Sequence, residues 1–406
     1  MTFQPSFTNR SGNGDAVNEA AILTRMSSLL RNIPGYASLL HPQSRTPADV
    51  QEVARGYLLI SVFYIHAMIG VSMHMGDQAW YSLIQLKLMA PNVSAFFFLS
   101  GMAAPALGKK GPARVLHLSV VLFFFAIVSH AIGFLILLAG IGYPSTWDAA
   151  RELFKPILLG TGYSSFVAWF FIVLAMARLF AYAFLRSRPV FILAIAICTA
   201  AIWIGQKLGA PDNIFEWRNW LTATLFFLIG MKLPDAKRIP DWAGILALVA
   251  SLSLALINRH GIFRIGPCLT CDLHFVSQPM IGQYGSIFVY VPQQLLFILF
   301  LLWAAHRSAH MLIGRVARFF GQASLAILLL HGWVLLTLYP GMLDGMPKAE
   351  TPFLFVAILC SAIVVHALLY IWLIRPLHWL QTQIFKVSDI GWRSRSPRPD
   401  RSVSAP

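Results

Sequence analysis

The chain has 406 residues, of which 57% are hydrophobic and 12% are charged, with a formal net charge of +15 and a mean hydropathy of +0.67. A soluble protein carries about twice that charged fraction, so the composition excludes an ordinary soluble domain and indicates a membrane protein. The positive charge does not indicate nucleic acid as a partner, because the basic residues stand at the ends of apolar runs.

The first 50 residues are polar and contain no apolar core typical of a cleavable signal peptide, so we expect a cytoplasmic N-terminal tail over 1–50. Ten apolar segments follow, each long enough to cross a bilayer. They are residues 56–75, 88–108, 114–140, 161–185, 189–208, 218–233, 241–258, 284–305, 319–339 and 352–374.

With the N-terminus inside, most of the 31 Lys and Arg residues fall in inside segments, which predicts that both termini are cytoplasmic. We therefore expect an all-α polytopic membrane helix bundle of about ten transmembrane helices, built from residues 51–380. The Arg-, Ser- and Pro-rich residues 381–406 are predicted to form a disordered basic cytoplasmic tail. Its basic residues would interact with the anionic lipids of the inner leaflet.

The first apolar segment contains the most informative pair of residues. Arg55 and His66 are separated by ten residues, none of them charged. A helix rises about 1.5 Å per residue, so His66 lies roughly 16 Å from Arg55 along the axis. If Arg55 marks the membrane surface, His66 is near the middle of the bilayer, where an ionisable group is costly and indicates a functional site.

Other segments carry polar residues at comparable depth when counted from the nearest inside charge. Ser100 lies about 13 Å deep, His331 about 20 Å deep, and Trp169 and His366 close to the depth of Ser100. These residues and His66 predict a polar chamber within one layer of the bilayer. A histidine there can take a proton from a hydroxyl group and later release it.

Buried histidines also have an ordinary structural explanation, a hydrogen bond to a neighbouring helix. That explanation is favoured for His130 and His366, whereas the wider pattern favours a functional role for His66 and His331. Ser324 precedes His331 by seven residues, so a helix would place both on one face.

The predicted outer loop before the eighth segment contains Cys268 and Cys271. In an oxidising compartment these cysteines predict a local disulfide. The flanking His260 and His274 make a zinc site the less favoured alternative, because their spacing fits no common zinc pattern. We therefore expect no metal in the site.

Three motifs in the right order resemble those of the acyltransferase type 3 family of integral membrane proteins, over about residues 50–380. Arg55 and His66 match its Arg-x10-His, and Phe96-Phe97-Phe98-Leu99-Ser100-Gly101 is similar to its Phe-Phe-x-Leu-Ser-Gly. Ser324-Leu325-x5-His331 is similar to its Ser-Leu-x-x-Tyr-Leu-x-His. Ten spans with cytoplasmic termini also fit the family.

The chain departs from the family pattern in three places. Glu52-Val53-Ala54 stands where many members have Asp-x-Leu before the arginine, and Lys109-Lys110-Gly111-Pro112-Ala113-Arg114 replaces an Arg-x-x-Arg loop. The stretch 165–170, which includes Trp169, lacks the glutamate of Trp-Ser-Leu-x-x-Glu and looks more like a Leu-Trp-Phe variant. That variant occurs in branches with glucan succinyltransferase-like members, so both acetyl and succinyl remain open as the transferred group.

The resemblance implies transfer of an acyl group from a cytoplasmic acyl-CoA to a hydroxyl of a carbohydrate or lipid-linked sugar, in the bacterial inner membrane. Acyl-CoA is then a co-substrate, and no bound cofactor is expected. It implies that His66 is the general base or a transient acyl carrier, with His331 as the second catalytic residue.

The donor-binding residues implied by the resemblance are basic. Arg55 would bind the phosphates or the pantetheine end of the donor, and the nucleotide end would be bound by Lys109, Lys110 and Arg114. These last three also have a simpler explanation as inside charges that set the topology. Roles in orienting the acceptor or stabilising the oxyanion are expected for Ser100, Ser324 and Trp169, with help from His331.

Two other classes of function are considered beside the acyltransferase. A multi-span transporter of a small solute or protons would also contain buried histidines, but no pair of segments shows the matched Gly and Pro breaks of an inverted repeat. A scaffold protein of the membrane would leave the histidines unexplained.

Overall fold

A computed structural model describes most of the chain between Pro47 and Leu369. The residues described are 47–75, 80–104, 107, 111–140, 145–160, 162–164, 167–184, 188–207, 214–233, 239–258, 282, 284–322, 324–325, 327–328, 331, 352–369 and 383. Both predicted tails and the Cys268–Cys271 loop therefore lie outside the described residues, except for Pro47–Val50 and Gln383.

The described residues form helices and their connections, without a β-strand, which confirms the all-α class. The principal helices are α3 (Pro47–Met75), α4 (Trp80–Met89), α5 (Ser94–Met102), α6 (Pro112–Gly140), α7 (Thr146–Leu159), α8 (Ala168–Phe184), α9 (Arg188–Lys207), α10 (Trp217–Lys232), α11 (Asp241–Ile257), α13 (Ile287–Ser308), α14 (Leu312–Gln322) and α16 (Pro352–Leu369). Two short 3₁₀ helices, η2 (Ala90–Val93) and η4 (Ile214–Glu216), precede α5 and α10.

Within the described part of the chain, three helices are long and apolar enough to cross a membrane, over Asp49–Val71, Pro112–Ala139 and Ile287–Ser308. Shorter apolar helices cover Ala168–Phe184, Asp241–Ile257 and Val356–Leu368. The expected ten spans and the cytoplasmic position of both termini stay predictions.

Large apolar side chains also cover the outside of the molecule. Leu116, Val120 and Leu135 of α6 are more than half exposed, as are Ile245 and Val249 of α11. Exposure of such an apolar surface to water would be unfavourable, whereas contact with lipid tails would not be. The exposed faces therefore agree with the composition in indicating a membrane protein.

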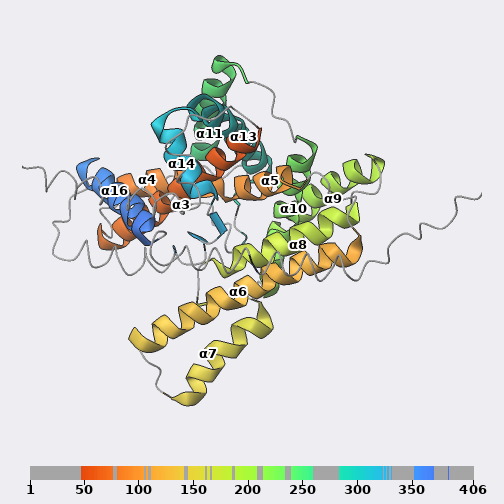
Figure 1. The fold of residues 1–406 in the computed structure, drawn as a ribbon. Helices are drawn as coiled ribbons and strands as arrows, with labels where there is room; N and C mark the ends of the chain where they lie inside the picture. Colours follow the sequence, from red (N-terminus) through yellow and green to blue (C-terminus); the bar gives the residue numbers. More distant parts are fainter. Residues whose placement is uncertain are drawn as a thin grey trace, which may run out of the picture.

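The first long helix, α3, organises the part of the molecule that contains the candidate site. It packs against α4, α13, α14 and α16, while α6 lies alongside α8 and α11 alongside α13 (Figure 1). The core between the helices is rich in aromatic side chains, and Phe63, Phe171, Phe226 and Phe227 are fully buried.

The close approach of α5 and α10 depends on two glycines. A side chain at Gly101 would collide with the backbone of Phe227, and one at Gly230 would collide with the backbone of Phe98. Glycine permits this backbone contact, which is the usual way for membrane helices to pack tightly. The contact fixes Ser100, the neighbour of Gly101, against the bundle.

The second predicted span, 88–108, is not one continuous helix. The chain turns through η2 between α4 and α5, with Pro91 in the first turn of η2. Proline lacks a backbone N–H and its ring clashes with the preceding turn, so the helix is interrupted there. Within the predicted span, the regular α-helix is therefore α5, from Ser94 to Met102.

Helix α7 was not predicted, although its start has a recognisable signal. The Ser145 hydroxyl accepts a hydrogen bond of 3.1 Å from the Asp148 backbone N–H, as an N-terminal cap does. The helix ends at Gly160, which has the left-handed conformation (φ 64°) that glycine adopts readily.

Candidate functional site

A cavity of about 220 Å³ opens between α3, α5, α6, α8 and the residues that follow α14. Most of its wall is apolar, but four polar side chains line it: Arg55, Ser100, Arg178 and Ser324. Three of these four were predicted from the sequence as site residues. The structure therefore brings motif residues from three separate segments around one space.

Arg55 reaches this cavity from the third turn of α3. Its guanidinium donates a hydrogen bond of 3.4 Å to the backbone oxygen of Leu99 in α5, the residue before Ser100. This bond ties the arginine to the helix that contributes Ser100. Only part of the guanidinium is used, since five N–H donors are available in an arginine.

Arg178 is a site residue that was missed in the sequence. It lies on α8, lines the same cavity as Arg55, and is close enough for the two positive charges to interact. In the described part of the chain Arg178 has no carboxylate partner. Two like charges facing one small space repel each other unless an anion lies between them, so the pair indicates an anion-binding site.

Spacing along α8 could have identified Arg178. Phe170, Leu174 and Arg178 recur at intervals of four residues, and all three line the cavity. Such an interval places side chains on one helix face. By charge alone, Arg178 is explained as one of the inside residues that set the topology. Its position on the same helix face as Phe170 is the observation that points to the cavity.

The basic cluster before the third segment is described only in part. Lys109 and Lys110 lie outside the described residues, whereas Arg114 is in the first turn of α6. Arg114 does not line the cavity, but Leu118 and Leu122, one and two turns further along the same face, do so. Arg114 therefore lies one helical turn before Leu118, the first residue of α6 that lines the cavity.

Three histidines come together next to Phe63. The rings of His66 and His331 have centroids 5.3 Å apart. The ring of His366 stacks on Phe63 at 4.0 Å, and Phe63 is 6.3 Å from the ring of His331. His331 and His366 are buried, while His66 is half-buried.

Hydrogen bonds determine which nitrogen of two histidines carries the proton. His331 Nδ1 lies 3.1 Å from the Leu328 carbonyl oxygen, and His366 Nδ1 lies 2.7 Å from the Ala362 carbonyl oxygen. A carbonyl oxygen can only accept, so each Nδ1 carries the hydrogen and each Nε2 keeps its lone pair. No described residue offers either buried Nε2 a hydrogen bond, so both are available as bases.

The single polar layer expected from the sequence separates into two groups. His66, His331 and His366 form the histidine cluster, whereas Ser100 lies in the wall of the cavity with Arg55. His366, for which a structural role was favoured, belongs to the cluster.

Trp169 belongs to neither group. Its ring contacts Phe170 edge to face, with centroids 6.2 Å apart, so it stands behind the cavity wall.

The two groups are connected along α3 and along the segment after α14. Eleven residues make about three helical turns, so Arg55 and His66 lie on nearly the same face of α3. Leu328 lines the cavity, and its carbonyl oxygen accepts the hydrogen bond from His331. The cavity and the histidine cluster therefore share two structural elements.

His130 is different from these histidines, as expected. The Ser164 backbone N–H donates to His130 Nδ1 at 3.0 Å, and His130 Nε2 donates to the Leu153 carbonyl oxygen at 3.0 Å. Both ring nitrogens are satisfied by backbone, so this histidine ties α6 to α7 and has no lone pair for chemistry.

Among the residues that the structure describes, no three His, Cys, Asp or Glu side chains are arranged to hold a metal ion. The arginines can bind an anion, the serines can donate or accept hydrogen bonds, and the histidines can accept a proton.

An all-helical molecule with apolar outer faces, a cavity lined by arginines and a buried cluster of basic imidazoles has the character of a membrane-embedded enzyme. A family model described as an acyltransferase domain matches residues 52–372, and the chain belongs to the acyltransferase type 3 family. The resemblance seen in three short motifs is thus confirmed, and the protein is a membrane acyltransferase. Neither a curated protein nor a solved structure matches the chain significantly.

Proposed function

We propose that this protein transfers an acetyl or succinyl group from a cytoplasmic acyl-CoA to a hydroxyl of a carbohydrate or glycolipid acceptor, in the inner membrane of a bacterium. The observation that carries this proposal is the cavity that Arg55 and Arg178 both line, close enough for their positive charges to interact. Membership of the acyltransferase family supplies the reaction class.

The arginine pair supports an anionic acyl donor. Guanidinium groups bind phosphate oxygens with two parallel hydrogen bonds, and CoA carries phosphates next to its pantetheine arm. The pantetheine arm is long and flexible, and it would run along the apolar wall of the cavity. Arg114, with Lys109 and Lys110 before it, would bind the nucleotide end outside the cavity.

The histidine cluster supports proton transfer at the acceptor. The acceptor hydroxyl would give its proton to His66, assisted by His331, while its oxygen attacks the thioester carbonyl carbon. The carbon–sulfur bond then breaks, and the CoA sulfur takes the proton from the imidazolium. Ser100 and Ser324, which line the cavity, would donate hydrogen bonds to the carbonyl oxygen as negative charge develops on it.

The orientation of the chain would bring the two substrates together from opposite sides. If both termini are cytoplasmic, Arg55 faces the cytoplasmic supply of acyl-CoA and His66 lies deeper in the bilayer. A carbohydrate or lipid-linked sugar could then reach the histidine cluster from the membrane or from its outer side.

The proposal is tested with the full-length protein in nanodiscs, supplied with radiolabelled acetyl-CoA or succinyl-CoA and an extract of membrane glycolipids. We expect the label to move to acceptor material in the wild type, and this transfer to be lost in Arg55→Ala and His66→Ala. His310→Asn, which changes an exposed histidine near the start of α14, is the matched control and should retain transfer.

Two results would contradict the proposal. One is transfer that survives His66→Ala unchanged. The other is a wild-type protein that consumes neither thioester. Uptake of a solute or of protons into vesicles without acyl transfer would instead support the transporter alternative.

A further inference from the structure

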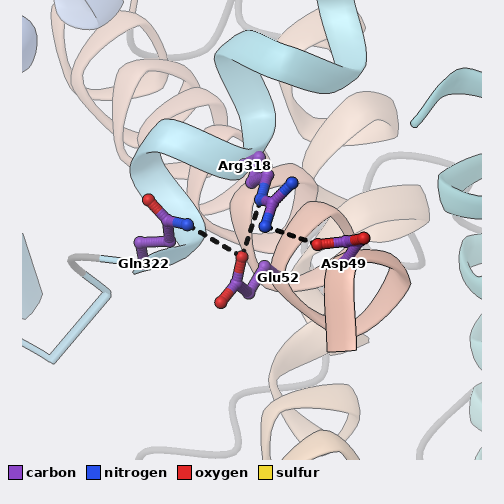
Figure 2. A network of polar contacts seen from close by, with 4 residues as sticks. All are labelled: Asp49, Glu52, Arg318 and Gln322. Atoms are coloured by element: carbon purple, nitrogen blue, oxygen red, sulfur yellow. Dashed lines mark hydrogen bonds and ion pairs between the residues drawn. The ribbon is translucent and has the colours of Figure 1, made fainter. Parts of the chain in front are cut away.

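The start of α3 is fastened to α14 by a polar network centred on Arg318 (Figure 2). Arg318 Nε donates to Glu52 Oε2 at 2.8 Å, and its Nη2 forms an ion pair with Asp49. The same Glu52 oxygen accepts a hydrogen bond of 2.9 Å from the side-chain amide of Gln322. The carboxylate of Glu52 is therefore held by two residues of α14.

Two glycines bring the helices close enough for this network. A side chain at Gly56 would collide with the backbone of Ala317, and one at Gly321 would collide with the backbone of Glu52. The Arg318 side chain is only 14% exposed, so its contacts with the carboxylates are largely shielded from water. Shielded, charge-assisted contacts of this kind are stronger than exposed ones.

Glu52 also lies one helical turn before Arg55. Residues three apart are neighbours on a helix surface, and an acidic and a basic residue at this spacing attract each other. The two charges are close enough to interact in the structure. Yet Glu52 bonds to Arg318 and Gln322, whereas Arg55 bonds to the Leu99 carbonyl oxygen on the other side.

We propose that Arg318 is a positioning residue that keeps the Glu52 carboxylate on α14, so that the Arg55 guanidinium stays available to the anionic donor. The inference rests on the proposed role of Arg55 in binding acyl-CoA. Without Arg318, the Glu52 carboxylate can turn toward Arg55, one helical turn along α3 and close enough to interact with it. A carboxylate bound to Arg55 competes directly with a phosphate for the same N–H groups.

The test is a double-mutant cycle on the full-length protein in nanodiscs, with CoA binding measured by calorimetry and acyl transfer measured with labelled acyl-CoA. Arg318→Met should weaken CoA binding about tenfold while changing kcat much less. Glu52→Gln should bind CoA as tightly as wild type, because the competing charge is gone. The double variant Arg318→Met/Glu52→Gln should recover to within about threefold of wild type.

Comparison of CoA affinity with melting temperature separates positioning from simple fastening of the helices. If Arg318 only stabilises the contact between α3 and α14, the melting temperature should fall together with CoA affinity in Arg318→Met and recover together with it in the double variant. A competing Glu52 carboxylate instead lowers CoA affinity in Arg318→Met well beyond any loss of stability. Arg307→Met is the matched control, because it breaks the Arg307–Asp241 ion pair between α13 and α11, away from the cavity. It should leave CoA binding unchanged.

The inference is overturned if Arg318→Met binds CoA like wild type, or if the double variant is no better than the single one. Thermal unfolding in detergent shows whether each variant is folded. Should Arg318→Met not fold, Glu52→Gln alone decides: weaker CoA binding would mean that Glu52 supports Arg55 and would refute the inference. A wild type that neither binds CoA nor transfers acyl groups would overturn the proposed function, and this inference with it.

Discussion

The arginine-lined cavity and the histidine cluster differ in the way they deal with polar groups inside an apolar molecule. In the cavity, Arg55 and Arg178 keep their charges and face a space of about 220 Å³. In the cluster, His331 and His366 are buried against Phe63, and each gives its one N–H to a backbone carbonyl. The cavity therefore offers positive charge and space to a ligand, whereas the cluster offers nitrogen lone pairs in an apolar setting.

This difference indicates a division of tasks. A charged and open region suits a ligand that arrives with its own charge, since the opposite charges cancel on binding. A close-packed region of neutral imidazoles suits a group that only needs to lose or gain a proton. We therefore expect variants of the cavity to change the affinity for the donor, and variants of the cluster to change the rate of transfer.

Replacement of His66 should have the largest effect. His66→Gln removes the proposed base from the cluster without leaving a large gap, and kcat should fall by about 10²-fold or more. CoA binding should be unchanged, because Arg55 and Arg178 remain in place. Acyl transfer and calorimetry on the same preparation measure both quantities, and an equal loss in kcat and in CoA affinity would refute the division of tasks.

Replacement of Arg178 should have an intermediate effect, on the KM for acyl-CoA and not on kcat. Arg178→Met preserves the length of the side chain but removes one charge from the cavity, so the KM for acyl-CoA should rise about tenfold with little change in kcat. Arg151→Met, which changes an exposed arginine of α7, is the matched control and should leave KM as it is. A fall in kcat at constant KM would place Arg178 in the chemical step instead.

Replacement of Gly101 should have the smallest effect on activity and should act through packing. The added methyl group of Gly101→Ala would meet the backbone of Phe227, force α5 and α10 apart, and lower the free energy of unfolding by about 1–3 kcal/mol. Gly111→Ala is the control, because a side chain there has nothing within 4 Å.

Thermal unfolding in detergent compares the two glycine variants. Equal melting temperatures would show that the contact between α5 and α10 tolerates a side chain. Donor affinity should fall only severalfold in Gly101→Ala, through the displacement of Ser100 in the cavity wall, while the histidine cluster stays intact.

Much of this arrangement is predictable because it depends on helical spacing within single segments. The interval from Arg55 to His66 is close to three turns, so it specifies a common face whatever the partner helices are. The burial of His331 follows from its place in a long apolar run. The family motifs singled out Ser100 and Ser324 separately, and both lie in the wall of one cavity.

The remainder depends on contacts between segments, to which the spacing within one segment is only a partial guide. Arg178 looks like an inside charge until α8 is seen to turn the face of Phe170 and Leu174 toward Arg55. His366 looks structural until its Nε2 is seen to lack a partner among the described residues. The break at Pro91 was predictable in principle, since proline interrupts hydrogen bonding in any helix.

The most direct test of the account is an experimental structure of the full-length protein in nanodiscs with CoA bound. The account predicts that an anionic group of CoA lies between the guanidinium groups of Arg55 and Arg178, with the thiol directed along α3 toward His66. CoA bound elsewhere on the protein, with both arginines uninvolved, would contradict it.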